Sequence, residues 1–375
     1  MTLLHITPSY KPAFCYGGPT LSVSYLCETL ARQRHTVDVL TTTANGRTEL
    51  AVPTAAAQLT EGVKVRYCRR WTGDHTHFSP ALLWQVWQNC RQYDVVHIHS
   101  WWNTAAVFSV LICRIRGVRP MVSPRGMLSP YTMRSRAKRI FHRLVGRVLL
   151  TGAVLHATSE QEKREITGLV PGAETCCLPN LVPLPPLQAT APVGQDCFQI
   201  LFLGRIDPKK GLEWLLRALP RLKIPYRLTI AGSGAPEYET DLRRLAEDLG
   251  LKARVVWAGW VDGAQKSRLL AGADVFVLPS HNENFANAAL EALAMGTPAV
   301  LSDRVGLADY VQQTGFGRVC PAEVNAIAEA LGDLAKTGPS QGRKTMAERV
   351  RRDFDPERLA QAYVEVYRTL AGRDR

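Results

Sequence analysis

Acidic residues are missing from a long stretch of this 375-residue chain. Between Val95 and Ser159 the sequence contains no aspartate and no glutamate. The same stretch holds ten cationic residues, which are Arg114, Arg116, Arg119, Arg125, Arg134, Arg136, Lys138, Arg139, Arg143 and Arg147. The whole chain has a formal net charge of +13. This imbalance predicts one strongly positive surface in the N-terminal half.

Long apolar runs and metal-binding cysteine pairs are also missing. No run reaches the roughly 18 apolar residues that indicate a membrane-spanning helix, so any membrane contact is expected to be peripheral. The first residues lack a basic segment and meet Pro8 after a short apolar run, which favours a first strand over a signal peptide and predicts a cytoplasmic protein. The nine cysteines form no Cys-x-x-Cys pair, so neither structural zinc nor a disulfide framework is expected.

What the sequence does contain is the pattern of an α/β protein. Apolar runs typical of strands alternate with amphipathic helical segments, which predicts parallel β/α units. Prolines interrupt this pattern in residues 183–197 and predict a linker. We expect two Rossmann-like β/α/β domains, residues 1–182 and 198–354, with the active site in the cleft between them. A last helix in residues 355–375 is expected to cross back to the N-terminal domain.

A first candidate binding motif follows the strand that ends at Leu203. The chain continues as Gly204-Arg205-Ile206-Asp207-Pro208-Lys209-Lys210-Gly211 before helical spacing resumes. Gly204 permits a close approach of a ligand to the backbone, and Arg205 and Lys210 can neutralise a diphosphate. The alternative interpretation is a pair of solvated loop cations.

A second candidate motif follows the apolar strand Val275 to Leu278. Glu283 falls in the loop after this strand, and Glu291 falls on the helix that comes next. The first N–H groups of a helix are unpaired and carry the positive end of its dipole, so they can bind phosphate. Carboxylates on either side would then bind hydroxyl groups, Glu283 those of a sugar and Glu291 those of a ribose. The alternative is an acidic helix start favoured by the dipole.

Together with Ala292-Leu293-Ala294-Met295-Gly296-Thr297-Pro298, these motifs resemble glycosyltransferase family 4, retaining enzymes of the GT-B fold. The resemblance spans nearly the whole chain and includes Gly17-Gly18-Pro19, Asp94 to His99, Pro179-Asn180, Ala231 to Gly234 and Gly259-Trp260-Val261. It implies that Arg205 and Lys210 bind the donor diphosphate, Glu283 the sugar and Glu291 the ribose, with no metal and no cofactor. It extends the donor site to Gly17, Gly18, Gly204, Val261, Asn284, Phe285, Ala286 and Asn287.

One segment departs from the family pattern. Many relatives place a histidine where this chain has Arg125, in Ser123-Pro124-Arg125-Gly126-Met127-Leu128. This form is similar to a branch associated with bacterial surface polysaccharides such as capsule and exopolysaccharide. Arg125 either stabilises the departing diphosphate, as a catalytic group alongside Arg205, Lys210 and Glu283, or binds the acceptor. The acceptor site is expected to include His99, Trp101, Trp102 and Arg125.

Two further patterns have competing interpretations. His97 and His99 share one face of a strand and could bind metal, but a buried strand end is the favoured interpretation. Within Tyr131 to Leu150, four arginines follow helical spacing, and the other face is expected to hold Ala137, Ile140, Phe141, Leu144, Val145 and Val148. This basic amphipathic helix is either packed on the core or part of a segment, residues 114–147, that docks on an anionic membrane surface.

The resemblance therefore implies a retaining hexosyltransferase. Its donor is expected to be a UDP- or GDP-sugar, and its acceptor a glycan linked to polyprenyl diphosphate at the cytosolic face of the membrane. A nucleotide-sugar epimerase and a non-enzymatic basic adaptor for lipid or RNA stay open as alternatives, although no stacking motif or recognition module supports nucleic-acid binding. A dehydrogenase is not expected, because Gly232-x-Gly234 is followed by Glu237 where the dinucleotide fingerprint needs Gly or Ala.

Overall fold

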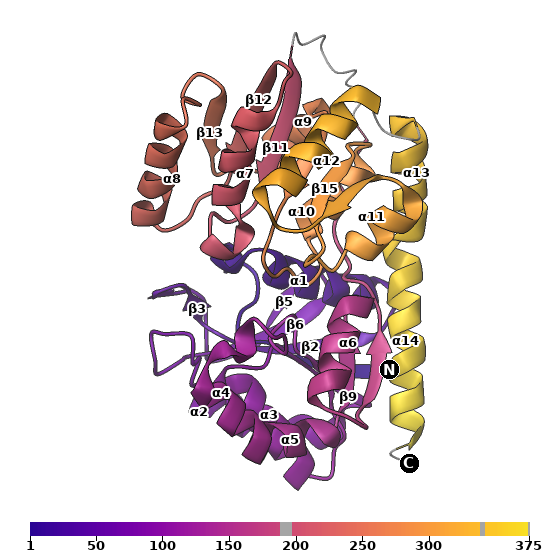
Figure 1. The fold of residues 1–375 in the computed structure, drawn as a ribbon. Coiled ribbons are helices and arrows are strands. Elements are labelled where there is room, and N and C mark those ends of the chain that lie inside the picture. Colours follow the sequence, from indigo (N-terminus) through magenta and orange to yellow (C-terminus); the bar gives the residue numbers. More distant parts are fainter. Residues whose placement is uncertain (188–196, 338–341, 374–375) are drawn as a thin grey trace. The chain divides into compact units, whose positions relative to one another are not determined.

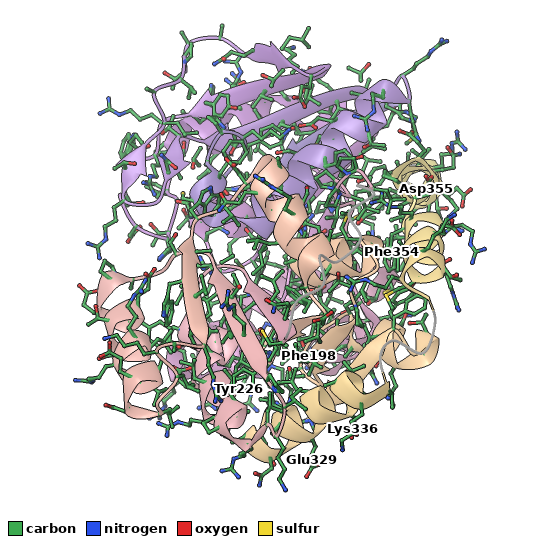
Figure 2. All side chains as sticks on the ribbon, turned by 90° about the horizontal axis from the view of Figure 1, so that it is seen from above. Phe198, Tyr226, Glu329, Lys336, Phe354 and Asp355 are labelled. Atoms are coloured by element: carbon green, nitrogen blue, oxygen red, sulfur yellow. The ribbon has the colours of Figure 1, made fainter. Side chains whose placement is uncertain are left out.

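The computed structural model describes residues 1–187, 197–337 and 342–373, which form two compact units (Figure 1). The first unit comprises Met1–Pro183 and the segment from Asp355 onward, and the second comprises Leu184–Phe354. Most of the expected linker, residues 183–197, lies outside the described residues. The last helix, α14 (Pro356–Arg373), belongs to the first unit, and Figure 2 labels Phe354 and Asp355, where the chain leaves the second unit.

An eight-stranded sheet in the order β10-β9-β8-β7-β1-β2-β6-β5 organises the first unit. Its strands are β1 (Thr2–Ile6), β2 (Thr36–Thr42), β5 (Gln58–Thr60), β6 (Val63–Cys68), β7 (Val95–His99), β8 (Met121–Ser123), β9 (Val154–Ala157) and β10 (Glu174–Cys177). The strands pair in parallel, except for the antiparallel pair of β5 and β6 at one edge. All five residues of β7 are buried, as expected for a parallel strand covered on both faces.

Helices cover this sheet. They are α1 (Gly18–Arg32), α2 (Pro80–Asn89), α3 (Thr104–Ile115), α4 (Arg136–Phe141), α5 (Arg147–Thr151), α6 (Glu160–Leu169) and α14. Side-chain capping fixes where helix α3 begins, because the side chain of Asn103 accepts a hydrogen bond from the Ala106 N–H. A small hairpin of β3 (Ala44–Asn45) and β4 (Thr48–Glu49) lies outside the large sheet.

The second unit contains a six-stranded parallel sheet in the order β13-β12-β11-β14-β15-β16. Its strands are β11 (Phe198–Leu203), β12 (Tyr226–Ala231), β13 (Val255–Gly259), β14 (Val275–Leu278), β15 (Ala299–Ser302) and β16 (Gly317–Cys320). Figure 2 labels Phe198 and Tyr226, the paired first residues of β11 and β12, and Glu329 and Lys336 on helix α12. The two parallel sheets confirm the predicted Rossmann-like fold class.

Seven α-helices lie between or after these strands in the described part of the second unit. They are α7 (Leu212–Ala218), α8 (Pro236–Asp248), α9 (Gly263–Gly272), α10 (Asn287–Ala294), α11 (Ala308–Thr314), α12 (Val324–Thr337) and α13 (Arg343–Asp353). Beyond α13, the Asp355 carboxylate accepts a hydrogen bond of 2.8 Å from the Arg358 N–H at the start of α14. Asp355 therefore caps the start of α14, ahead of Pro356 in its first turn.

Of the two interpretations left open for the basic helix, packing of its apolar face on the core does not describe the structure. A π-helical turn, His142–Gly146, joins α4 to α5. The core-facing positions are taken by His142, Gly146, Leu149 and Leu150. The residues expected on the apolar face instead meet solvent, except for the half-buried Phe141. In the described part of the chain, we find no helix with the length and apolar character needed to cross a membrane.

Candidate functional site

The strand order of the second unit creates a break between β11 and β14. From β11 the chain builds the sheet outward through β12 and β13, and it then returns to place β14 on the other side of β11. In open parallel sheets, ligands bind beyond the carboxyl ends of the strands at such a switch point. The two segments predicted to bind the donor leave these two neighbouring strands.

The loop after β11 has a fixed shape. Asp207 accepts a hydrogen bond of 3.1 Å from the Lys209 N–H, and a short 3-10 turn follows. Gly211 then adopts the left-handed conformation with φ of 70°, and a Cβ atom at this position would lie 2.3 Å from the Pro279 carbonyl oxygen. The His281 N–H donates to the Lys209 carbonyl over 2.7 Å. The loops after β11 and β14 are therefore held in direct contact.

This contact brings two predicted donor residues together. The Lys210 ammonium donates a hydrogen bond to the Glu283 carboxylate, and both side chains are largely buried. The backbone of Glu283 is anchored by the Arg304 carbonyl over 3.0 Å and by the Gly306 N–H over 2.9 Å. Arg205 is about half exposed, with its Nε atom 3.8 Å from the Asp207 carboxylate. Two cations thus flank one anchored carboxylate.

The charges around Glu283 keep it ionised. Burial by itself raises the pKa of this carboxyl group, but Lys210, Lys209 and Arg205 together outweigh burial and hold the pKa below its ordinary value. Burial also lowers the pKa of the Lys209 ammonium, against the opposing charge of Glu283. The site therefore combines an acceptor for hydroxyl groups with three cations suited to an anionic ligand.

Glu291 lies in a different environment on helix α10. It is nearly fully buried, and the Lys266 ammonium on α9 lies 2.8 Å from one of its carboxylate oxygens. Burial raises the pKa of Glu291 in spite of this cation. Sequence reasoning missed Lys266, because a single lysine on the first turn of an ordinary helix carries no signal of its partner.

The other predicted donor residues occupy four places. Asn284, Phe285, Ala286 and Asn287 connect Glu283 to helix α10, with Phe285 and Ala286 buried and Ala286 in the left-handed conformation. Val261 is buried two residues after the end of β13, and Gly204 directly follows β11. Gly17 and Gly18 lie in the first unit, at the start of α1.

In the first unit, a comparable break falls between β1 and β7, and Arg125 lies close to it after β8. One terminal nitrogen of Arg125, Nη1, donates to the Ser22 hydroxyl over 3.0 Å and to the Asn180 side-chain oxygen over 2.9 Å. Its Nε and Nη2 atoms lie 3.4 and 3.3 Å from His99 Nδ1. Arg125 has a φ of 53°, which is uncommon for a residue other than glycine. The guanidinium is therefore held from three sides.

A row of buried histidines lies beside Arg125. His5 Nδ1 and His99 Nε2 are 3.0 Å apart, and the Ser123 hydroxyl joins His97 to His156 through two contacts of 2.6 Å. Burial, together with the charge of Arg125, lowers the pKa of His5 to about 3, and burial lowers that of His156 to about 3. These rings are therefore neutral at physiological pH.

His5, His97 and His99 are close enough together to be considered as a metal site. Ligand atoms of His5, His97 and His99 all lie within 4.8 Å of one another. However, His97 already bonds the Tyr367 hydroxyl of α14 over 2.7 Å as well as Ser123, and His99 contacts both His5 and the cationic Arg125. A metal ion would have to displace these contacts next to a fixed positive charge. The row fits better as a buried polar network that positions Arg125.

The predicted acceptor residues divide between core and loop. Trp101 is fully buried in the hydrophobic core of the first unit, and His99 is buried at the end of β7. Trp102 is half-buried, and its Nε1–H donates to the Met127 carbonyl over 2.5 Å. Sequence reasoning missed Ser22 as a partner of Arg125, because the two residues are distant in sequence and belong to no shared motif.

Glu162 also supports the loop that carries Arg125. Its carboxylate accepts hydrogen bonds of 2.6 Å from the Gly126 N–H and 2.7 Å from the Thr158 N–H. Ser159 caps helix α6, and its hydroxyl accepts a hydrogen bond of 3.1 Å from the Glu162 N–H. The capping pair therefore links the start of α6 to the turn after β8.

Comparisons with known proteins show the family of this chain. One family model, described as a glycosyl transferase 4-like domain, matches residues 17–180, and a second, described as glycosyl transferases group 1, matches residues 197–337. The chain is 29% identical to glycogen synthase of Mycobacterium tuberculosis, over 98% of this chain and 94% of that protein. It is 27% identical to phosphatidyl-myo-inositol mannosyltransferase of Mycobacterium leprae, over 95% and 94% of the two chains.

Solved structures support the fold. The Anabaena protein HepE, solved in complex with UDP and glucose, matches with a TM-score of 0.78 and 20% identity over 98% of this chain and all of the other. At this level of identity, the match concerns the fold alone.

Proposed function

Since this chain is a glycosyltransferase of the family 4 type with the GT-B fold, we propose that it is a retaining hexosyltransferase of bacterial surface polysaccharide biosynthesis. Its donor is a UDP- or GDP-sugar. Its acceptor is a glycan carried on polyprenyl diphosphate at the inner face of the cytoplasmic membrane. A mannosyltransferase named for a phosphatidylinositol lipid is among the relatives, which supports a lipid-linked acceptor.

The ion pair between Lys210 and Glu283 is the observation that carries this proposal. It places an ionised carboxylate and an ammonium group at the switch point, close in sequence to Arg205. In the proposed complex, Arg205 and Lys210 bind the diphosphate of the donor, and Glu283 accepts hydrogen bonds from hydroxyl groups of the transferred sugar. Glu291, buried beside Lys266, binds the ribose.

The proposed chemistry requires no protein nucleophile. The acceptor hydroxyl attacks the anomeric carbon from the face that the diphosphate leaves, and a phosphate oxygen takes the proton of that hydroxyl. The bond between the anomeric carbon and the diphosphate oxygen breaks as the new glycosidic bond forms. The side chains contribute by positioning the two substrates and by stabilising charge on the departing diphosphate.

Arg125 has one of two roles in this scheme. Its guanidinium either stabilises the departing diphosphate or binds the acceptor. Its three-sided support by Ser22, Asn180 and His99 suits both roles, since each needs a cation held in one position. The two roles differ in kinetics. Loss of the first lowers kcat, and loss of the second raises the KM for the acceptor.

A thermal unfolding experiment tests donor binding. The full chain is heated with UDP, GDP, ADP and a panel of their sugar conjugates. A ligand at one hundred times its Kd that binds only the native state stabilises it by about 2.7 kcal/mol and raises the unfolding midpoint. We expect one nucleotide to raise the midpoint of the wild type and to have little effect on Lys210→Ala. A panel in which no nucleotide raises the midpoint would contradict the proposal and favour the basic adaptor.

A transfer assay tests the acceptor. The selected donor, radiolabelled in its sugar, is incubated with bacterial membranes, and the lipid fraction extracted with chloroform and methanol is counted. We expect label in this fraction only when enzyme and membranes are both present. Label in water-soluble glycan alone would contradict the lipid-linked acceptor. Conversion of the donor sugar in the absence of any acceptor would identify an epimerase.

A further inference from the structure

Three helices of the first unit expose an unusual number of apolar side chains. Nine of the fifteen exposed large hydrophobic residues in the described chain lie on α2, α3 and the continuous helix α4 to α5. They are Trp84, Trp87, Phe108, Leu111, Ile115, Ile140, Leu144, Val145 and Val148. We refer to these nine residues and the cations between them as the three-helix surface.

The three helices are direct neighbours. Helix α2 packs on α3, and α3 packs on α5, so the exposed side chains belong to adjoining elements (Figure 1). The Arg114 guanidinium on α3 donates to the Val148 carbonyl on α5. Arg116, at the end of α3, lies 5.1 Å from the centre of the Trp87 ring on α2. These contacts connect the apolar groups of the three helices.

Other residues occupy the inner side of this helix, which leaves its aliphatic residues facing outward. His142 points inward and contacts the Leu169 carbonyl over 3.0 Å. Gly146 is buried, and a Cβ atom there would lie 3.1 Å from the His142 ring and 3.6 Å from that of Trp101. With these two residues and Leu149 filling the inner side, Leu144 is left 69% exposed. An exposed cluster of this size is typical of an interaction site.

The charge of the surface has one sign. Helices α2 to α5 and the segments between them, from Pro80 to Thr151, contain one acidic residue, Asp94. Its carboxylate accepts hydrogen bonds from the backbone N–H and the hydroxyl of Thr2. The cations of α3 to α5 are Arg114, Arg136, Lys138, Arg139, Arg143 and Arg147. Within residues 1–187, 197–337 and 342–373, none of these six cations forms an ion pair. The surface therefore combines apolar groups with charge that the protein does not neutralise.

We propose that the three-helix surface docks on a membrane containing anionic phospholipids. Lipid phosphates complement the unpaired cations, and the acyl region accepts the aliphatic side chains of Ile140, Leu144 and Val148. Trp84 and Trp87 suit the boundary between these layers, where tryptophan rings are enriched. A nucleic acid would complement only the charge. A second copy docked through the same surface would bring like charges together.

This inference does not rest on the proposed function, because membrane binding can be measured without sugar transfer. Full-length protein is sedimented with vesicles of phosphatidylcholine, with and without 30% phosphatidylglycerol, in low and high salt. We expect binding to the anionic vesicles and at least ten-fold weaker binding to pure phosphatidylcholine. We also expect the anionic component of binding to weaken as salt screens it.

Two variants separate the apolar and cationic contributions. Arg139→Gln with Arg143→Gln should weaken binding about 30-fold, since each cation near an anionic surface contributes about five-fold. Leu144→Ser with Val148→Ser should weaken it at least ten-fold. All four side chains are exposed, so the thermal midpoint of both variants should equal that of the wild type.

Matched controls alter other surfaces in the same way. Arg244→Gln with Lys252→Gln removes two exposed charges from the second unit, and Leu59→Ser removes an exposed leucine from β5. Both controls should bind vesicles as the wild type does. The proposal is overturned if no vesicle binds or if the controls weaken binding as much as the test variants. It is also overturned if Leu144→Ser with Val148→Ser converts a dimer to a monomer without altering vesicle binding. The same holds if the test variants bind RNA more weakly than the wild type but bind vesicles equally well.

Discussion

Lys210 and Glu283 form an ion pair across the carboxyl ends of two neighbouring parallel strands, β11 and β14. The pair depends on the close contact between the loops that follow these strands, including the hydrogen bond from the His281 N–H to the Lys209 carbonyl. One consequence is electrostatic, because nearby cations hold the pKa of the Glu283 carboxyl below its ordinary value in spite of burial. Glu283 is thus an ionised acceptor next to charges suited to a diphosphate.

Replacement of Lys210 tests this arrangement directly. Loss of a charge-assisted hydrogen bond costs about 1.5 to 3 kcal/mol, so Lys210→Ala should lower kcat/KM by roughly 10- to 150-fold. The pKa of Glu283 should rise in this variant, because a stabilising cation is removed. Steady-state transfer rates measure the effect, with Lys252→Ala on an exposed loop as the control. Wild-type kcat/KM in Lys210→Ala would remove Lys210 from the site.

Much of the fold could be predicted because buried parallel strands are continuous apolar runs. Strand β14 (Val275–Leu278) coincides with its prediction, and all four of its residues are buried. The motifs that follow β11 and β14 could be placed at the same edge of the sheet for the same reason. Helix α13 (Arg343–Asp353) was not predicted, because its sequence is dominated by charged residues and shows little apolar periodicity.

The remaining features depend on contacts between distant residues. The hydrogen bond from Arg125 to Asn180 joins segments that no local pattern relates. Helical periodicity grouped Ile140, Leu144 and Val148 on one face but could not show whether that face meets the core. It meets solvent, because His142, Gly146, Leu149 and Leu150 take the core-facing positions. Trp101 could not be recognised as a core residue, because its neighbours in sequence, Ser100 and Trp102, gave no indication of which side chain points inward.

Acid should destabilise the first unit through its buried histidines. The folded-state pKa of His5 and of His156 is lowered to about 3, so the folded protein stays unprotonated while the unfolded chain takes up protons near pH 6.5. The unfolded state then binds more protons, and the free energy of unfolding falls as the pH falls from 6.5 toward 3. The expected loss is about 2 kcal/mol for each of the two histidines by pH 5.

Urea unfolding at pH 7.5 and pH 5.0 measures this dependence. His5→Asn should reduce the difference in unfolding free energy between the two pH values, because one depressed group is removed. His75→Gln removes an exposed histidine and serves as the control for a general effect of losing an imidazole. If His5→Asn and the wild type lose the same free energy between the two pH values, His5 does not contribute as proposed.

Arg125→Lys tests whether the guanidinium itself is required. A lysine keeps the charge but cannot bond Ser22, Asn180 and His99 simultaneously in the planar geometry of arginine. We expect the free energy of unfolding to fall by about 1 to 3 kcal/mol, because buried partners of the guanidinium are left unpaired. We also expect kcat/KM to fall at least ten-fold, which corresponds to the loss of roughly one hydrogen bond to a charged group. The split between kcat and the acceptor KM identifies its role. Arg134→Lys, at an exposed position, should change neither quantity.

Gly211 should be required for both the stability and the binding function of the second unit. Gly211 and Gly250 share the left-handed conformation, with φ of 70° and 69°, but only Gly211 faces an obstacle, the Pro279 carbonyl oxygen at 2.3 Å from an added Cβ. Gly250→Ala should therefore cost about 1 to 2 kcal/mol for the backbone conformation alone. Gly211→Ala adds a clash that separates the two loops, for a total of roughly 2 to 5 kcal/mol. Because those loops hold Lys210 beside Glu283, Gly211→Ala should also abolish the midpoint shift given by the nucleotide donor, while Gly250→Ala should retain it. Equal urea midpoints and equal donor shifts in the two variants would show that the loop contact is not needed to form the site.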